Sequence, residues 1–387
     1  MLKVKLVTIG RFWHFHLARQ LLKFNLLDEI YSGYPQFKLN DEKHIPLDKI
    51  KTYPYYQVPY LFFNKYFANN SSFINHYLSE LSHKKIAIKV SENLGNSNVL
   101  IATSGSGLEA GKQIKSLNGK FVCDRGSTHI NFQNETLKEE YKNFKIYYNE
   151  ISKKTVERET KEYHAADLIS VPSSFVYNSF LKQGIDQKKL FLNPFGVNLN
   201  RFNPLPKIND SKFNVLYVGT LSIRKGIFYL LEAFKKLKFK NKKLTLIGPI
   251  DNNIKDKVFK YLSDEIKYLS VIENKKLNKY YSMADVMVQP SVEEGLSLVM
   301  AEALACGCPV IATENTGAED LFQNNKEGFI IKARSIDQIH DKMQLLADNK
   351  LLQKEMSNHA ILKVKKIGGW NDYGNKWYEK LKSIVNE

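Results

Sequence analysis

Short apolar runs alternate with stretches of helical periodicity along the whole chain. The apolar runs of the first half lie at 4–9, 99–102, 121–123 and 168–171. Those of the second half lie at 215–219, 244–248, 268–272, 286–288, 310–312 and 328–331. Runs without polar alternation are typical of parallel strands that are buried on both faces. Strands and helices in alternation over 387 residues predict two doubly wound, Rossmann-like α/β domains.

The segment Pro290–Gly317 predicts a strand, a tight loop, a helix over 296–305 and a further strand. Glu294 falls in the loop and Glu302 inside the helix, about 12 Å apart from the helical rise. Paired glycosidase carboxylates are roughly 5–9.5 Å apart, so these two predict contacts with two ends of one ligand instead. The alternative is an ordinary crossover helix whose glutamates are solvated.

Between the two glutamates the chain offers groups that suit a phosphate. Backbone N–H groups around Leu296 and Ser297 are free at the predicted start of the helix, where the helix dipole is positive. Gly295 has no side chain and would let a phosphate approach the backbone. The segment therefore predicts a site for a phosphorylated ligand.

The sequence E-E-G-L-S-L-V-M-A-E-A-L-A-C-G-C-P-V-I, from Glu293 to Ile311, resembles the E-x7-E signature of the retaining glycosyltransferases of family four. That resemblance implies the GT-B fold, with a cleft between two Rossmann-like domains. It implies that Glu294 contacts the donor sugar and takes part in catalysis, and that Glu302 binds the ribose of the nucleotide. It also implies that the nucleotide base lies near Ile272.

A second match lies after the strand that ends at Gly219. The family usually has an arginine directly after this glycine and a lysine five residues later, and the two hold the donor diphosphate. Lys225 fits the lysine, but Thr220 stands in the arginine position, so we expect Arg224 to supply the missing charge. The alternative is a solvated basic pair before a helix.

The first half resembles the family more loosely. Gly10 follows the first strand and is a candidate phosphate contact. Arg11, His14 and His16 either line the cleft or only cover a helix. The resemblance suggests a catalytic histidine near the reacting sugar, and His129 matches it best; the alternative is a histidine in a surface loop.

The resemblance also implies a division of the chain. We expect an acceptor-side domain at 1–196, a donor-binding domain at 197–368, and a C-terminal helix at 369–387 that crosses back to the first domain. Basic side chains and a helix N-terminus would balance the charge of the leaving diphosphate, so we expect no metal and no cofactor beyond the nucleotide sugar. Cys123, Cys306 and Cys308 are expected to be buried thiols.

A formal net charge of +17 favours anionic partners. No nucleic-acid-binding motif is present, so a membrane surface is the better expectation. The aromatic segment Tyr53–Phe67 either packs into the core of the first domain or forms an interfacial surface. The chain has no apolar run that could span a bilayer and no pattern typical of a signal peptide, which favours the cytoplasm, with peripheral attachment to the inner face of the membrane.

The predicted function is the transfer of a sugar, with retention, from a nucleoside diphosphate sugar to a hydroxyl of a saccharide or lipid-linked saccharide, in bacterial surface polysaccharide or glycolipid biosynthesis. Two alternatives remain open in the same fold. One is a catalytically inactive scaffold or nucleotide-sugar-binding subunit, because Thr220 and the single glycine at Gly10 depart from the family pattern. The other is a nucleotide-sugar epimerase, which would need an acid/base set that we do not find.

Overall fold

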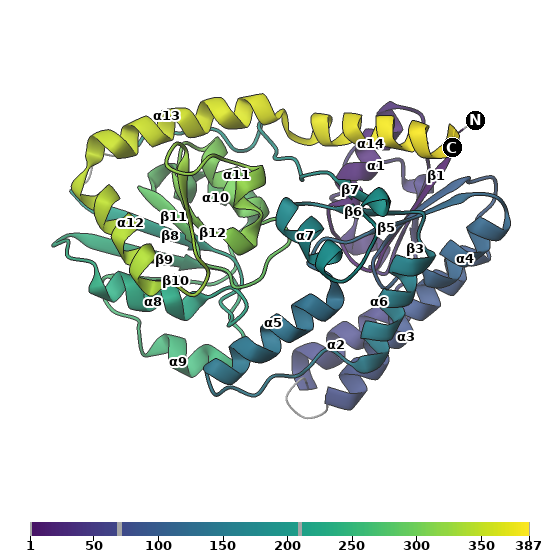
Figure 1. Ribbon diagram of the computed structural model, residues 1–387, viewed down its shortest axis with the longest axis horizontal. Coiled ribbons are helices and arrows are strands. Elements are labelled where there is room, and N and C mark those ends of the chain that lie inside the picture. Colours follow the sequence, from purple (N-terminus) through teal and green to yellow (C-terminus); the bar gives the residue numbers. More distant parts are fainter. Residues whose placement is uncertain (1, 68–71, 208–210, 387) are drawn as a thin grey trace.

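The computed structural model describes residues 2–67, 72–207 and 211–386, without the side chains of residues 66, 67, 72 and 386. Within this part of the chain, two parallel sheets of seven and six strands lie side by side (Figure 1). We call the part that carries the seven-stranded sheet the first domain and the part that carries the six-stranded sheet the second domain. The prediction of two Rossmann-like domains is confirmed.

All strand pairs of the first sheet are parallel. In sheet order its strands are β3 (Ile50–Thr52), β2 (Leu27–Ser32), β1 (Val4–Thr8), β4 (Val99–Thr103), β5 (Lys120–Asp124), β6 (Leu168–Val171) and β7 (Leu190–Leu192). Every residue of β1 and β6 is buried, as expected for strands that helices cover on both faces. The sheet order changes direction at β1 and β4, and ligands of such folds bind beyond the carboxyl ends of the strands at this place.

The second sheet is also parallel throughout. In sheet order its strands are β10 (Ile266–Leu269), β9 (Lys242–Ile247), β8 (Phe213–Val218), β11 (Val286–Gln289), β12 (Val310–Thr313) and β13 (Gly328–Ile331). The order changes direction at β8 and β11, which are the strands that lead to Lys225 and Glu294. The fold thus brings the two strongest candidates of the sequence to the same edge.

Helices connect the strands and pack on both sheets. Those of the first domain are α1 (His14–Lys23), α2 (Gln57–Phe67), α3 (Ser72–Ser91), α4 (Leu108–Ser116), α5 (Ile130–Asn143), α6 (Lys153–Ala165) and α7 (Ser174–Lys182). Those that follow are α8 (Ile227–Lys236), α9 (Lys255–Phe259), α10 (Asn274–Met283), α11 (Leu298–Ala305), α12 (Ile336–Asp348), α13 (Lys350–Ile367) and α14 (Gly369–Asn386). Cys123, Cys306 and Cys308 are buried free thiols, as predicted.

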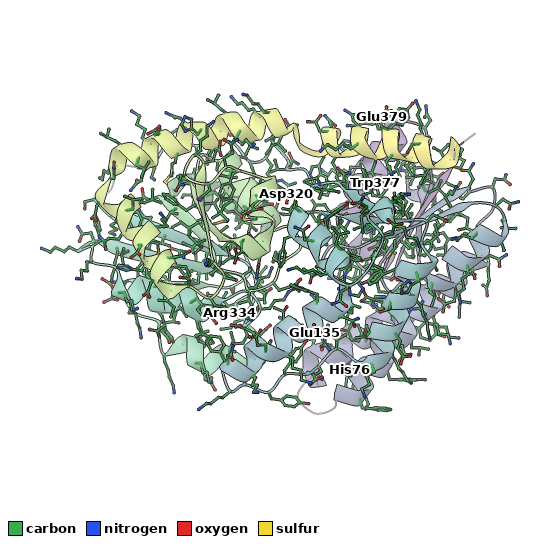
Figure 2. The ribbon with its side chains drawn as sticks, viewed as in Figure 1. His76, Glu135, Asp320, Arg334, Trp377 and Glu379 are labelled. Atoms are coloured by element: carbon green, nitrogen blue, oxygen red, sulfur yellow. The ribbon has the colours of Figure 1, made fainter. Side chains whose placement is uncertain are left out.

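The chain crosses back to the first domain at its C-terminal end. Helix α13 lies along the second domain, and α14 packs on α1 of the first (Figure 1). Trp377 of α14 is fully buried on the side of the first domain, where its ring meets Phe191 (Figure 2). At the crossing, a Cβ atom on Gly196 would lie 2.4 Å from the backbone of Gly369, so the two connections between the domains touch each other. The crossing helix is confirmed; the boundaries at 196 and 368 stay a prediction.

The aromatic segment from Tyr53 does not simply pack into the core. Gln57 is buried, but Tyr55 and Phe62 are 72% and 59% exposed. Beyond the segment, Phe73 and Tyr77 on α3 are 78% and 53% exposed. The side chains of Tyr66 and Phe67 lie outside the described residues. Within residues 2–67, 72–207 and 211–386, no helix combines the length and the apolar character needed to cross a membrane.

Candidate functional site

A cavity of about 590 Å³ opens between the two domains. Its first-domain wall comes largely from the segment after β1, from α1 and from residues 41 and 42, and its second-domain wall comes from the ends of β8 and β11 and the start of α11. The lining residues are Arg11, Phe12, Trp13, Phe15, His16, Arg19, Asp41, Glu42, Gly126, Phe195, Arg201, Val218, Gly219, Lys225, Gln289, Glu294, Leu296, Ser297, Leu298 and Val299. We refer to this cavity as the cleft.

The predicted phosphate site lies on the second-domain wall. Leu296, Ser297 and Leu298 all line the cleft, and Ser297 is the residue before the first turn of α11. The helix therefore begins at Leu298, two residues later than we expected. Its first backbone N–H groups have no partner inside the helix and suit a phosphate group in the cleft.

Lys225 and Glu294 meet in the cleft. The ammonium of Lys225 forms an ion pair with the Glu294 carboxylate. Burial, followed by the charge of neighbouring Arg224, lowers the pKa of Lys225 to about 7. The next residue, Gly226, has a φ of 67°, and a Cβ atom there would lie 2.0 Å from the carbonyl oxygen of Pro290. Only glycine permits this close approach, which brings the Lys225 loop against the loop that carries Glu294.

Glu302 lies one turn inside α11 and is not among the residues that line the cleft. Its carboxylate accepts a hydrogen bond of 2.8 Å from the Tyr281 hydroxyl and one of 3.4 Å from Asn274 Nδ2. Burial raises the pKa of Glu302 to about 7, against the opposing effect of these donors and of Arg201. The group is therefore poised between its charged and neutral forms near neutral pH.

Two other residues predicted for this wall make contacts within the protein. Arg224 does not face the cleft: its guanidinium donates to the Glu293 carboxylate at 2.7 Å and to the Ser127 hydroxyl at 2.8 Å. Gly295 is required by the protein itself, since a Cβ atom there would lie 1.8 Å from the carbonyl oxygen of Gly126 in the first domain. Arg224 is thus paired with Glu293 in this structure, and the roles of Arg224 and Gly295 in donor binding stay predictions.

His129 does not join the other candidates. It is 2% exposed, and its Nδ1 accepts a hydrogen bond from the Asn131 amide at the start of α5. Its ring packs against Tyr163 and Phe180, and burial followed by the charge of Arg125 lowers its pKa to about 4. The histidine caps a helix in the first domain, so the geometry does not support its expected place beside the reacting sugar.

Gly10 and Ile272 lie beside the cleft lining and not in it. The carbonyl oxygen of Gly10 accepts a hydrogen bond from Ser32, and the cleft begins at the next residue, Arg11. Strand β10 ends at Leu269, earlier than we expected, which leaves Ile272 in the following loop, where it packs against the core. Their roles in donor binding stay predictions.

On the first-domain wall, two of the candidates from the sequence, Arg11 and His16, contact residues that the sequence did not single out. Arg11 and Arg19 both bind the carboxylate of Glu42, which is 7% exposed. The ring of His16 stacks on Trp370 with centroids 4.0 Å apart, and burial with the nearby arginines lowers the pKa of His16 to about 3. Of the three candidates at this place, Arg11 and His16 line the cleft. His14 is fully buried and lies 3.1 Å from Asp124.

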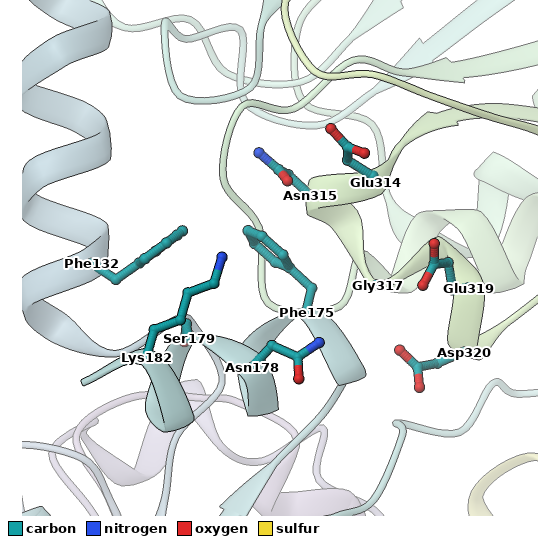
Figure 3. Close-up of a pocket in the computed structure, with 10 residues that line it drawn as sticks. All are labelled: Phe132, Phe175, Asn178, Ser179, Lys182, Glu314, Asn315, Gly317, Glu319 and Asp320. Carbon is teal, nitrogen blue, oxygen red and sulfur yellow. The ribbon is translucent and has the colours of Figure 1, made fainter. Parts of the chain in front are cut away.

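A smaller cavity of about 300 Å³ lies elsewhere between the domains (Figure 3). Figure 3 shows the Lys182 side chain rising between the rings of Phe132 and Phe175, opposite the acidic residues of the segment 314–320. The described parts of the chain hold no group of three or more histidine, cysteine, aspartate or glutamate side chains that could bind a metal ion.

The model of the family described as glycosyl transferases group 1 matches residues 201–363. This range contains the Lys225 loop, Glu294 and Glu302. This part of the chain belongs to that family. The match covers the second domain, where the sequence signatures lie.

Two curated relatives match somewhat more than half of the chain. The D-inositol 3-phosphate glycosyltransferase of Pseudarthrobacter chlorophenolicus is 25% identical over 224 residues, which cover 54% of this chain and 53% of the relative. The capsular polysaccharide biosynthesis glycosyltransferase CapM of Staphylococcus aureus is 26% identical over 239 residues, which cover 57% and 62% of the two chains. The chain thus spans about half the length of the curated relatives it matches.

Solved structures match over the whole chain. Anabaena Alr3699/HepE in complex with UDP and glucose has a TM-score of 0.71 at 14% identity, covering 99% of this chain and 100% of the other. Sucrose-phosphate synthase from Thermosynechococcus elongatus has a TM-score of 0.70 at 18% identity, with both chains covered completely. At such identities the likeness shows the fold, which is GT-B as expected.

Proposed function

We propose that the protein is a retaining glycosyltransferase that moves a sugar from a nucleoside diphosphate sugar to a hydroxyl group of a saccharide or lipid-linked saccharide. One observation carries the proposal: Lys225 and Glu294, from two separate loops of the second domain, meet in the cleft beside the start of α11. A diphosphate fits between the ammonium and the free N–H groups, and a carboxylate suits the hydroxyls of a sugar.

In the proposed reaction the bond between the anomeric carbon and the diphosphate oxygen breaks, and the acceptor oxygen bonds to that carbon on the same face. The acceptor proton passes to the leaving diphosphate. Lys225 and the start of α11 stabilise the negative charge that develops on the leaving group. Glu294 orients the sugar, and Glu302 binds the ribose once it is ionised. No step requires a metal ion or a further cofactor.

The relatives favour a role in surface polysaccharide or glycolipid synthesis, because one is named for capsular polysaccharide biosynthesis and another is a phosphatidylinositol monomannoside mannosyltransferase of Mycobacterium tuberculosis. We also propose that the first domain docks on an anionic membrane surface. Tyr55 just before α2 and Phe73 and Tyr77 on α3 are exposed, and α3 is the helix of His76, which Figure 2 labels. The net charge of +17 adds an attraction to anionic lipid.

The test of activity is a panel of UDP-, GDP- and ADP-sugars, with thermal shift to select the donor and release of nucleotide to measure turnover. Retention is checked by nuclear magnetic resonance of the anomeric proton of the product. We expect turnover that Glu294→Gln removes and that Glu355→Gln, an exposed carboxylate on α13, leaves intact. Binding of a donor without any release of nucleotide would indicate the inactive binding subunit instead.

Membrane docking has its own test. The protein should sediment with vesicles that contain anionic phosphatidylglycerol at low salt, stay in solution with neutral phosphatidylcholine vesicles, and leave the anionic vesicles at high salt. Protein that remains in the supernatant with anionic vesicles at low salt would contradict the docking proposal and leave the proposed activity untouched.

A further inference from the structure

A fully buried carboxylate joins the two domains directly behind the cleft. Glu293 is 0% exposed. One of its oxygens accepts hydrogen bonds from the Thr128 hydroxyl at 2.7 Å, the Thr128 amide at 3.2 Å and the Ser127 hydroxyl at 3.1 Å. The other accepts from Gln133 at 3.1 Å and from Arg224 at 2.7 Å. Three of these residues belong to the first domain, whereas Arg224 and Glu293 belong to the second.

This carboxylate is ionised in the folded protein. Burial alone would raise the pKa of Glu293, but the charge of Arg224 and the donors from Thr128 and Gln133 hold it at about 2. An ionised buried carboxylate is tolerated only where its partners satisfy it fully, and removing one partner is costly. The contact between the domains therefore depends on the complete set of donors.

The network continues into the first domain with alternating charge. Gln133 accepts a hydrogen bond of 2.9 Å from the Arg125 guanidinium, which also donates to the Glu159 carboxylate at 2.6 Å. Arg125 and Glu159 are both buried. A chain of contacts thus runs from the end of β5 to the loop that carries Lys225, through Glu159, Arg125, Gln133, Glu293 and Arg224; all but Arg224, whose side chain is 31% exposed, are buried. Such a chain has a defined geometry, because each charge is compensated only when its neighbour is in place.

The network is one residue away from the cleft on both loops. Arg224 precedes Lys225, and Glu293 precedes Glu294, the two residues that form the ion pair in the cleft. The Val292 amide donates to the carbonyl oxygen of Arg224 at 2.9 Å, which ties the two loops together. Neither Glu293 nor Arg224 lines the cleft. The ion pair of Arg224 and Glu293 therefore fixes the backbone from which the two cleft side chains project.

We propose that Glu293 is a positioning residue that joins the two domains in the arrangement in which Lys225 and Glu294 meet the donor. The inference rests on the proposed function and adds to it: Glu293 acts on the rate of transfer through its neighbours and makes no contact with the nucleotide sugar. The E-x7-E signature begins one residue later and does not include it.

The test is Glu293→Gln, which keeps the shape of the side chain and removes the charge that Arg224 requires. We expect kcat to fall about 100-fold, since small displacements of reacting groups have effects of this size. Affinity for UDP, or for GDP if the panel selects it, should change less than about threefold. Glu293 makes no contact with the nucleotide, so its substitution should lower the rate of transfer and leave ground-state binding nearly unchanged. Glu319→Gln, an exposed carboxylate of the same domain, is the matched control and should keep the wild-type kcat.

A second variant approaches the same contact from the first domain. Thr128→Val deletes the hydroxyl that donates at 2.7 Å and preserves the shape of the side chain. It should lower kcat about tenfold with unchanged nucleotide affinity, the size expected for one hydrogen bond to a charged group. If Glu293→Gln fails to fold, this variant decides the question. Wild-type kcat in a folded Glu293→Gln or Thr128→Val protein would overturn the proposal, as would a loss confined to nucleotide affinity.

A readout without substrate separates this proposal from the proposed function. Spin labels at Lys112→Cys on the first domain and Lys350→Cys on the second, both exposed sites, report the distance between the domains. Glu293→Gln should broaden the distance distribution, and Glu319→Gln should leave it unchanged. If the wild-type protein proves inactive with every donor, the proposed reaction fails. An inter-domain distance distribution that stays narrow in Glu293→Gln would overturn the positioning role, whether or not the protein is active.

Discussion

The two walls of the cleft hold their charged side chains in different ways. On the first-domain wall, Arg11 and Arg19 share the single carboxylate of Glu42. On the second-domain wall, Lys225 forms an ion pair with Glu294, and burial lowers the pKa of Lys225 to about 7. Glu302 lies behind this wall on α11, where burial raises its pKa to about 7. Groups with a pKa near 7 can change charge at neutral pH, whereas the pKa of His16 on the first-domain wall, at about 3, keeps that ring neutral. We therefore expect the second-domain wall to bind the donor and to dominate the effects of mutation.

The largest effect is expected for Lys225→Ala. If Lys225 stabilises the leaving diphosphate, its removal should lower kcat about 100-fold or more, as for other donors aimed at developing charge. Steady-state release of nucleotide measures the change, with Lys112→Ala on the outer surface as the control. A folded Lys225→Ala protein with wild-type turnover would mean that another group stabilises the leaving diphosphate. The second-domain wall would then no longer be expected to dominate the effects of mutation.

The next effect concerns nucleotide affinity. Glu302→Ala should weaken binding of the nucleoside diphosphate by about 1.5–3 kcal/mol, the range for hydrogen bonds to a charged group. Calorimetry measures the loss, and Tyr281→Phe is the matched control for the 2.8 Å hydrogen bond that Glu302 accepts within the protein. Equal losses in both variants would mean that Glu302 acts by holding Tyr281. An unchanged affinity in folded Glu302→Ala would exclude the ribose contact.

The two shifted pKa values also predict a pH dependence. Lys225 has its pKa lowered from 10.5 to about 7, so its ammonium is lost as the pH rises through 7. Glu302 has its pKa raised from 4.5 to about 7, so its carboxylate is lost as the pH falls through 7. Binding that needs both charged forms should be strongest near pH 7 and about threefold weaker one unit to either side.

Single variants separate the two limbs of this profile. Glu302→Gln should flatten the acidic limb and keep the alkaline limb, whereas Lys225→Ala should do the reverse. Calorimetry at pH 6, 7 and 8 is sufficient. A profile that stays bell-shaped in both variants would assign the titration to other groups, such as those of the bound nucleotide.

Four residues predicted for the second-domain wall line the cleft together, because local spacing along the chain places them there: Lys225, Glu294, Leu296 and Ser297. The interval between Glu294 and Glu302 and that between Gly219 and Lys225 are local spacings, which a single strand, loop and helix turn into geometry. Local patterns are the part of a structure that one sequence reveals best. The start of α11 was still predicted two residues too early, because Leu296 and Ser297 favour a helix but serve as the loop before it.

The first-domain wall could not be predicted in the same way. Glu42 binds arginines 31 and 23 residues away in the sequence, and His16 stacks on Trp370 from the far end of the chain. Glu293 was overlooked for the same reason, since its donors in the first domain lie about 160 residues away. The pairing of Arg224 with the buried Glu293 could not be predicted either, because nothing in the local sequence indicates which of two neighbouring glutamates faces the cleft.

The smallest effect is expected on the first-domain wall. The Arg11 side chain is 42% exposed, and Arg19 remains to neutralise Glu42 when Arg11 is removed. Exposed ion pairs contribute at most about 1 kcal/mol, and Arg11 has no donor contact in our proposal, so Arg11→Ala should change nucleoside diphosphate affinity less than about twofold. Calorimetry of nucleoside diphosphate binding to Arg11→Ala and to Lys225→Ala compares the two walls directly. A tenfold loss in Arg11→Ala would mean that the first domain supplies the positive charge for which the family uses an arginine at the position of Thr220. The diphosphate would then be held from both walls, and closure of the domains would be a condition for binding the donor as well as for the transfer itself.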